Sequence, residues 1–156
     1  MTDLDLSALW VSLQLATTTV IVLLLIGTPL AWWLAHTRSR IRPIIEALVA
    51  LPIVLPPTVL GFYLLITLGP YGPFGRFADL SLAFTFTGLV IASVFYSMPF
   101  VIQPLQGAFE AVGKAPLEAA WSLRASKLDA FLTVVSPIAL RGYISAIVLG
   151  FAHTIG

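Results

Sequence analysis

Four long apolar runs separated by shorter polar segments dominate the chain; they cover residues 8–34, 44–68, 82–105 and 132–156. A helix of about 24 residues rises about 1.5 Å per residue and so covers the roughly 30 Å hydrocarbon core of a bilayer. Because lipid offers no hydrogen bonds to the backbone, such runs must be helical. The pattern predicts an all-α, polytopic membrane helix bundle, with residues 1–156 forming a single transmembrane domain of four spanning helices.

The composition is typical of a chain that lies in a bilayer. Hydrophobic residues make up 59% of the chain and charged residues only 10%, whereas a soluble domain carries roughly 25% charged residues. The net charge of +1 gives no basic field for nucleic acid, and the absence of Cys excludes a disulfide framework or a thiolate metal site. We expect no metal and no cofactor.

The loops between the runs differ in charge. The basic residues between the first two runs are Arg38, Arg40 and Arg42, and those between the last two are Lys114, Arg124 and Lys127. Two crossings separate these loops, so both lie on one side, which the positive-inside rule makes the cytoplasm. The loop between the second and third runs carries only Arg76 against Asp79 and should face outward. We expect a multi-pass protein of a bacterial or archaeal cytoplasmic (inner) membrane.

The fourth run continues to Gly156 without a polar tail or a basic anchor. We therefore expect the chain to be a truncated piece of a longer protein, with one or more C-terminal spans missing. Such a piece is not expected to transport anything by itself.

Three prolines, Pro52, Pro56 and Pro57, interrupt the second run. Each removes a backbone donor and clashes with the preceding turn, so this helix must kink or unwind near the middle of the membrane. One interpretation is a packing kink, since membrane helices tolerate Pro. The other is that the freed carbonyls and Thr58 line a translocation path, as broken helices do in transporters; three prolines in six residues favour this one. His153, a polar residue deep in the fourth run, is a further candidate for that path.

Residues 115–131 form a short polar stretch with four charged residues, Glu118, Arg124, Lys127 and Asp129. The stretch is too short and too polar to span, and Pro116 suits a first helical position, so we expect one short helix here. Such a helix could rest on the inner leaflet or dock into another protein, and its periodicity does not decide between these. No phosphate-binding loop and no hydrolase or metalloprotease motif is present, so we expect no catalytic residue and an external source of energy.

The stretch Glu118–Ala119–Ala120, followed by FLTVVSP ending at Pro137, resembles the cytoplasmic Glu-Ala-Ala loop of binding-protein-dependent ABC importer permeases. In that family a Gly lies four residues after the second Ala, and a Leu-Pro pair comes further on. Here Arg124 stands at the Gly position and Ser136 precedes Pro137. The Gly implies a tight turn between two short helices, which Arg does not adopt cheaply if it needs positive φ.

Two other stretches extend the resemblance over essentially the whole chain. LPIVLPPTVLG is similar to the second helix of the molybdate-type branch of the family. FAHTIG is similar to a Phe-Ala-Arg segment, with His153 in place of Arg.

The resemblance implies a non-catalytic permease subunit for molybdate, with sulfate or tungstate permeases as close alternatives. It implies a cytoplasmic coupling loop at residues 115–130. The residues it assigns to coupling are Glu118, Ala119, Ala120, Leu123, Arg124 and Pro137. Its implied partners are a cytoplasmic ATP-binding subunit, a second copy of the permease and an external substrate-binding protein. An alternative of another class is a membrane anchor or regulatory subunit whose amphipathic helix rests on membrane lipid.

Overall fold

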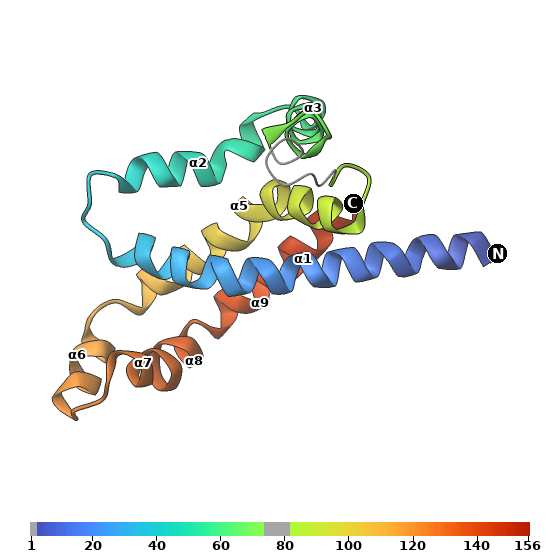
Figure 1. Cartoon of the computed structure of the whole chain (residues 1–156). Coiled ribbons are helices and arrows are strands. Elements are labelled where there is room, and N and C mark those ends of the chain that lie inside the picture. Colours follow the sequence, from blue (N-terminus) through green and yellow to red (C-terminus); the bar gives the residue numbers. More distant parts are fainter. Residues whose placement is uncertain (1–2, 74–81) are drawn as a thin grey trace.

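The computed structural model describes residues 3–73 and 82–156, and every regular element within these ranges is a helix (Figure 1). The prediction of an all-α fold is confirmed. Two helices, α1 (Asp3–His36) and α5 (Phe86–Val112), are each long and apolar enough to cross a bilayer. Two bent helix pairs would bring the number of spans to four if each pair crosses as one unit. The loop with Arg76 and Asp79, which we expect to face outward, lies outside the described residues.

Three helices, α1, α5 and α9 (Leu140–Ile155), form the core of the bundle. α5 packs against both of the others, and α1 also contacts α9. Small residues allow α5 and α9 to approach closely: Gly142 and Gly150 are buried, and a Cβ on Gly150 would lie 2.6 Å from Val101 Cγ2. Such residues are typical of membrane bundles, where close packing rather than hydrophobic burial holds helices together.

The second apolar run folds as two helices. These helices are α2 (Arg42–Val54) and α3 (Pro57–Leu68), and the chain bends by 110° between them. Leu55 adopts the extended conformation that a residue before Pro favours, with ψ of 136°, and Pro56 has the same ψ. The break expected from the prolines is therefore present, and it lies between α2 and α3, whereas Pro52 is buried within α2.

The two basic loops lie at one end of the molecule. α5 continues past Leu105 to Val112 and stops at Gly113, whose φ of +69° suits a residue without a side chain. Arg38 and Lys114 line one cavity, so the loops that follow α1 and α5 are neighbours. We call this the basic end; Figure 1 places the N-terminus at the opposite end.

The expectation of one helix across residues 115–131 is wrong. α6 (Ala115–Ser122) is followed by a turn, after which a separate short helix, α7 (Lys127–Ala130), begins. Arg124 has φ of +63°, which a continuing α-helix does not permit. The Ser126 hydroxyl caps α7 by accepting a hydrogen bond from the Asp129 N–H at 3.1 Å. Pro116 lies in the first turn of α6, as expected.

The fourth apolar run is also bent. A π-helical turn, η1 (Phe131–Val135), and the short α8 (Ser136–Ile138) precede α9. The chain bends by 71° between the segment Lys127–Ile138 and the segment Leu140–Ile155. Pro137 has no N–H to offer to the carbonyl of Thr133, which accounts for the irregular turns at this point.

Candidate functional site

The coupling loop, residues 115–130, packs on the bundle through the apolar side of α6. Leu117 and Ala120 are only 4% and 8% exposed. Both belong to the buried cluster that also contains Phe109 of α5. Ala130, at the end of α7, is fully buried in the same cluster. The loop is therefore seated on the buried cluster, and both α6 and α7 contact η1.

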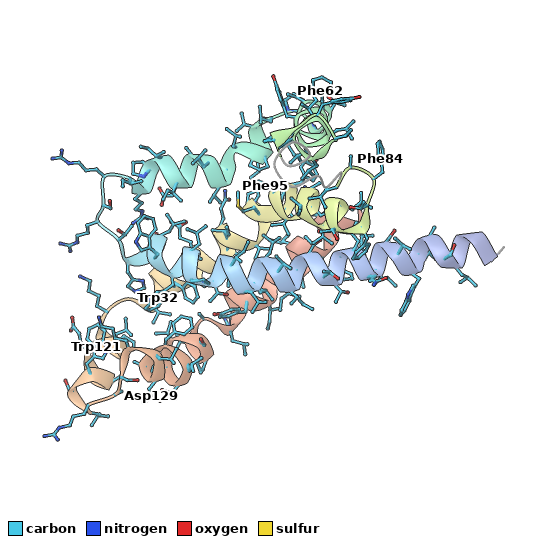
Figure 2. All side chains as sticks on the ribbon, in the orientation of Figure 1. Trp32, Phe62, Phe84, Phe95, Trp121 and Asp129 are labelled. Carbon is cyan, nitrogen blue, oxygen red and sulfur yellow. The ribbon has the colours of Figure 1, made fainter. Side chains whose placement is uncertain are left out.

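The opposite side of the coupling loop is exposed and mixed in character. Glu118 is exposed, and it makes no ion pair within the described part of the chain. Large apolar side chains accompany it: Trp121, Leu123 and Leu128 are 48%, 85% and 69% exposed. Figure 2 shows Trp121 and Asp129 on this segment, at the end of the molecule away from the N-terminus. Exposed apolar groups among charges are typical of a surface that binds another protein.

Arg124, at the position where the family pattern has Gly, adopts the turn expected of a Gly. Its φ of +63° is left-handed, its N–H donates to the Trp121 carbonyl at 2.9 Å, and the Ala125 N–H donates to the Ala120 carbonyl at 3.1 Å. These two bonds form a Schellman motif at the end of α6. The geometry is thus the one that Gly would provide, at a conformational cost of about 1–2 kcal/mol for a residue with a Cβ.

Sequence reasoning missed an aromatic cluster that joins η1, directly after the coupling loop, to the spanning helices. We define the cluster as Trp32 of α1, Phe109 of α5, Phe131 of η1 and Tyr143 of α9. The Trp32 ring centroid lies 5.3 Å from that of Phe109 and 5.1 Å from that of Phe131. Phe109 in turn lies 5.9 Å from Tyr143. Aromatic residues at the ends of spans also arise as interfacial belts, so the sequence pattern does not single out this cluster.

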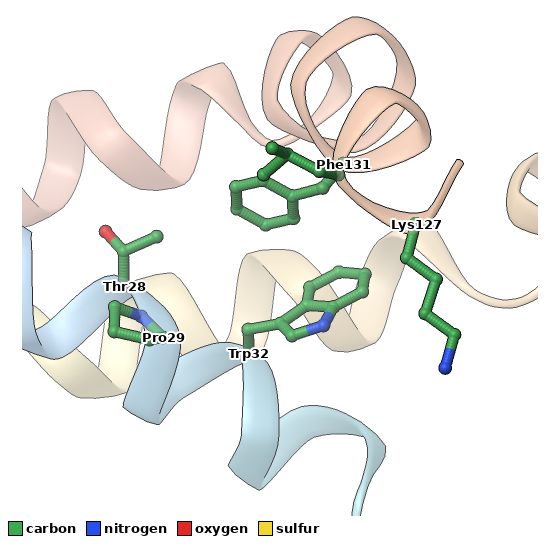
Figure 3. A pocket seen from close by; sticks show the side chains of 6 residues that line it. Thr28, Pro29, Trp32, Lys127 and Phe131 are labelled. Carbon is green, nitrogen blue, oxygen red and sulfur yellow. The ribbon is translucent and has the colours of Figure 1, made fainter. Parts of the chain in front are cut away.

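An apolar groove of about 410 Å³ lies between α1 and the second half of the loop (Figure 3). Its lining residues are Thr28, Pro29, Trp32, Lys127, Leu128 and Phe131. Figure 3 shows the Trp32 indole and the Phe131 ring close to one another across the groove, with Lys127 at its rim. The groove therefore lies beside α7, where Leu128 is exposed.

A charge network links α2 to α5 at the basic end. Arg42 Nε donates to Glu46 Oε1 at 2.7 Å, and its Nη2 donates to Glu110 Oε1 at 2.6 Å. Gln106 Nε2 donates to the same two carboxylates, at 2.7 and 3.1 Å. Each ion pair is partly exposed, so the network contributes chiefly by fixing the start of α2 against α5.

His153 lies in a polar cluster inside the bundle. Ser97 Oγ, which is fully buried, lies 3.0 Å from His153 Nδ1 and 3.0 Å from Thr154 Oγ1. The His153 ring stacks on Phe100 with centroids 3.9 Å apart and lies 4.5 Å from Tyr96. Sequence reasoning missed these partners, because a Ser in an apolar helix is ordinary in membrane proteins. Within residues 3–73 and 82–156, no group of three His, Asp or Glu side chains could hold a metal ion.

Tyr96 lies between the proline break and His153. Pro57 and Tyr96 line an open groove of about 240 Å³ between α3 and α5, and Tyr96 also contacts the His153 ring. Pro52 is buried in α2, and Thr58 is exposed at the start of α3; neither lines this groove, nor does the exposed Pro56. The structure therefore links Pro57 to the His153 cluster only by way of Tyr96, and Pro52, Pro56 and Thr58 lie outside this groove.

Comparison with known proteins agrees with the Glu-Ala-Ala resemblance. Residues 27–156 match the family model described as binding-protein-dependent transport system inner membrane component. The chain is 60% identical to the molybdenum transport system permease protein ModB of Azotobacter vinelandii, across 97% of this chain and 69% of the relative. A probable molybdenum ABC transporter permease protein of Haloferax volcanii is 37% identical, across 93% of this chain and 54% of the relative.

A more distant relative is named for the transport of a different anion, sulfate. The sulfate transport system permease protein CysT of Synechocystis is 34% identical, across 83% of this chain and 46% of the relative. The chain thus spans about two thirds of the Azotobacter relative and about half of the other two. The resemblance inferred from the sequence is confirmed.

Proposed function

The chain belongs to the family of inner membrane components of binding-protein-dependent transport systems, and on this premise we propose that it forms the membrane-spanning part of a molybdate importer. Relatives named for molybdenum are between 31% and 60% identical to it, and each aligns over 93% or more of the chain. The sulfate permease is 34% identical, well below the 60% of the Azotobacter relative, and aligns over only 83% of the chain. Molybdate is therefore favoured over sulfate as the transported anion.

The observation that carries this proposal is the two-sided construction of the coupling loop. Its buried side packs on the common core through Leu117 and Ala120, and η1, which directly follows the loop, contacts α1 and α5 through Phe131. Its exposed side presents Glu118 and Leu123 to the surroundings. Because close-packed cores transmit displacement rather than absorb it, a partner that grips the exposed side would move the spanning helices with it. We assign that partner as a separate cytoplasmic ATP-binding subunit, since the chain has no phosphate-binding loop.

The same construction disfavours an anchor whose helix rests on lipid. A surface helix must keep its apolar face free to enter the acyl layer. In α6 that face is used inside the protein, because Leu117 and Ala120 are buried. The face that remains mixes Trp121 with Glu118, and such a mixture suits a protein surface better than an acyl layer.

We propose that the anion passes near the break between α2 and α3, beside the Ser97–His153–Thr154 cluster. A second copy of the permease would complete the route, and an external substrate-binding protein would deliver the anion. In this arrangement the chain crosses the membrane several times and its basic end faces the cytoplasm. His153→Phe preserves ring stacking on Phe100 and removes the polar ring nitrogens, so it should slow uptake without preventing assembly. Uptake at the parent rate would exclude His153 from the route.

Charge reversal at the coupling loop tests the proposed partner. The full-length subunit, assembled with its ATP-binding partner and its binding protein in proteoliposomes, should take up labelled molybdate when ATP is supplied. Glu118→Lys places a cation where a carboxylate is expected to meet the partner, so it should abolish uptake while leaving membrane insertion intact. Glu118→Gln keeps the shape and should retain most of the activity. Parent-level uptake by Glu118→Lys would refute the docking role.

A further inference from the structure

A second cavity lies at the basic end, next to the coupling loop. Its volume is about 460 Å³, and it lies where α1 and α5 end and where α2 and α6 begin. Three cationic side chains, Arg38, Arg42 and Lys114, line it together with one carboxylate, Glu110. Phe109, which is fully buried, contributes an apolar wall. We call this cavity the basic pocket.

Only part of the positive charge in the basic pocket is neutralised. Arg42 is already engaged with Glu46 and Glu110. Arg38 and Lys114 are exposed, and neither makes an ion pair or a side-chain hydrogen bond with any described residue. The pocket therefore offers two free cations that line one cavity and are contributed by two different loops.

Capping of helix ends does not account for these two cations. A Lys or Arg after a helix often hydrogen-bonds the last carbonyls, but within residues 3–73 and 82–156 neither Arg38 nor Lys114 does so. The helix dipoles also offset one another here, because α1 and α5 end at the pocket while α2 and α6 begin there without side-chain caps. The side chains therefore set the sign of the potential, and that sign is positive.

We propose that the basic pocket binds a tetrahedral oxyanion group between Arg38 and Lys114. A guanidinium can pair with two oxygens of such a group, and an ammonium adds a point charge. One source is the phosphate of an anionic phospholipid, because basic pockets at the cytoplasmic ends of membrane helices bind such headgroups. The other source is a free oxyanion from the cytosol. The site is separate from the His153 cluster and does not depend on which anion the protein transports.

The test compares two double variants with the same change in net charge. Arg38→Gln with Lys114→Gln removes both free cations of the pocket, whereas Arg40→Gln with Arg141→Gln removes two exposed cations that do not line it. Each full-length complex is purified with mixed phosphatidylglycerol and phosphatidylcholine, and the retained lipid is counted by native mass spectrometry. Thermal shift with inorganic phosphate measures binding of the free ion. Arg38→Lys with Lys114→Arg keeps the charge and serves as a check that the pocket still folds.

The two sources give different results. A lipid site predicts retained phosphatidylglycerol in the parent, the Arg40/Arg141 variant and the charge-preserving variant, with loss in the Arg38/Lys114 variant and no stabilisation by phosphate. A free-anion site predicts stabilisation by phosphate that disappears in the same variant, with no selective lipid retention. Equal lipid retention and equal phosphate response in all variants would overturn the proposal.

Discussion

Replacing Gly142 with Ala tests the packing on which the fold depends. Gly142 is buried on α9 where that helix meets α5, so an added methyl group has no free space. Gly107, on α5, offers a matched control, because nothing lies within 4 Å of the position its Cβ would take. Both residues lie in helices, so both substitutions gain similar helix propensity.

The magnitude follows from the contacts that the new Cβ would make. It would overlap the Cβ of Ala108 and lie 3.2 Å from the Pro104 carbonyl oxygen, whereas non-bonded carbon atoms rest roughly 3.5–4.0 Å apart. Because Ala108 Cβ and the Pro104 carbonyl cannot rotate away, α9 itself must shift. Overpacking of this kind costs about 1–3 kcal/mol, against a propensity gain of up to about 1 kcal/mol that both variants share. The difference between the variants therefore reports the strain.

Thermal unfolding in one detergent measures this difference. Gly107→Ala should unfold at the parent temperature or slightly above it. Gly142→Ala should unfold roughly 2–12 °C lower than Gly107→Ala, taking about 2–4 °C per kcal/mol for a chain of this size. If Gly142→Ala matched or exceeded Gly107→Ala in unfolding temperature, the close approach of α5 and α9 would be refuted.

Two further substitutions address local features. Arg124→Gly should leave the free energy of unfolding unchanged or raise it by less than about 1 kcal/mol, once the greater entropy of unfolded Gly is counted. Arg124→Val should lower the free energy of unfolding by about 1 kcal/mol or more, because a β-branched residue resists φ of +63°. Equal stability of the two variants would contradict the turn. Thr19→Val should raise stability by up to about 1–3 kcal/mol, because Thr19 Oγ1 is buried without a hydrogen-bond partner among the described residues. A clear loss of stability in chemical unfolding would show that the hydroxyl is satisfied.

Features that depend on local chemistry could be predicted from the sequence. The run at residues 8–34 lies within α1, and the break near Pro56 and Pro57 is present because the missing N–H acts within one turn. The end of α6 could not be read from residue propensities, since Arg124 is a poor choice for positive φ. Only the family pattern, with its Gly at this position, pointed to a turn there.

Features that depend on tertiary contacts could not be predicted in the same way. The Glu-Ala-Ala stretch marked Glu118 as a candidate, and Glu118 is exposed on a seated loop. No local pattern indicates that Arg42 pairs with Glu110, 68 residues away. Likewise, the aromatic cluster draws one ring from each of four elements. Which of many interfacial aromatic residues meet is decided by helix packing, which periodicity does not specify.

Cross-linking from position 118 tests most directly whether the coupling loop engages an ATP-binding subunit. Residues 1–156 contain no Cys, so Glu118→Cys is the one attachment point in this part of the permease for a maleimide photo-crosslinker, used in a complex whose other Cys residues are replaced by Ser. Tyr71→Cys, at a residue 86% exposed beyond α3, is the control on the side expected to face outward. Light should join the permease to the ATP-binding subunit from position 118 and not from position 71. Absence of that adduct, or labelling of the Glu118→Cys variant in intact cells by a thiol reagent that cannot cross the membrane, would contradict the account.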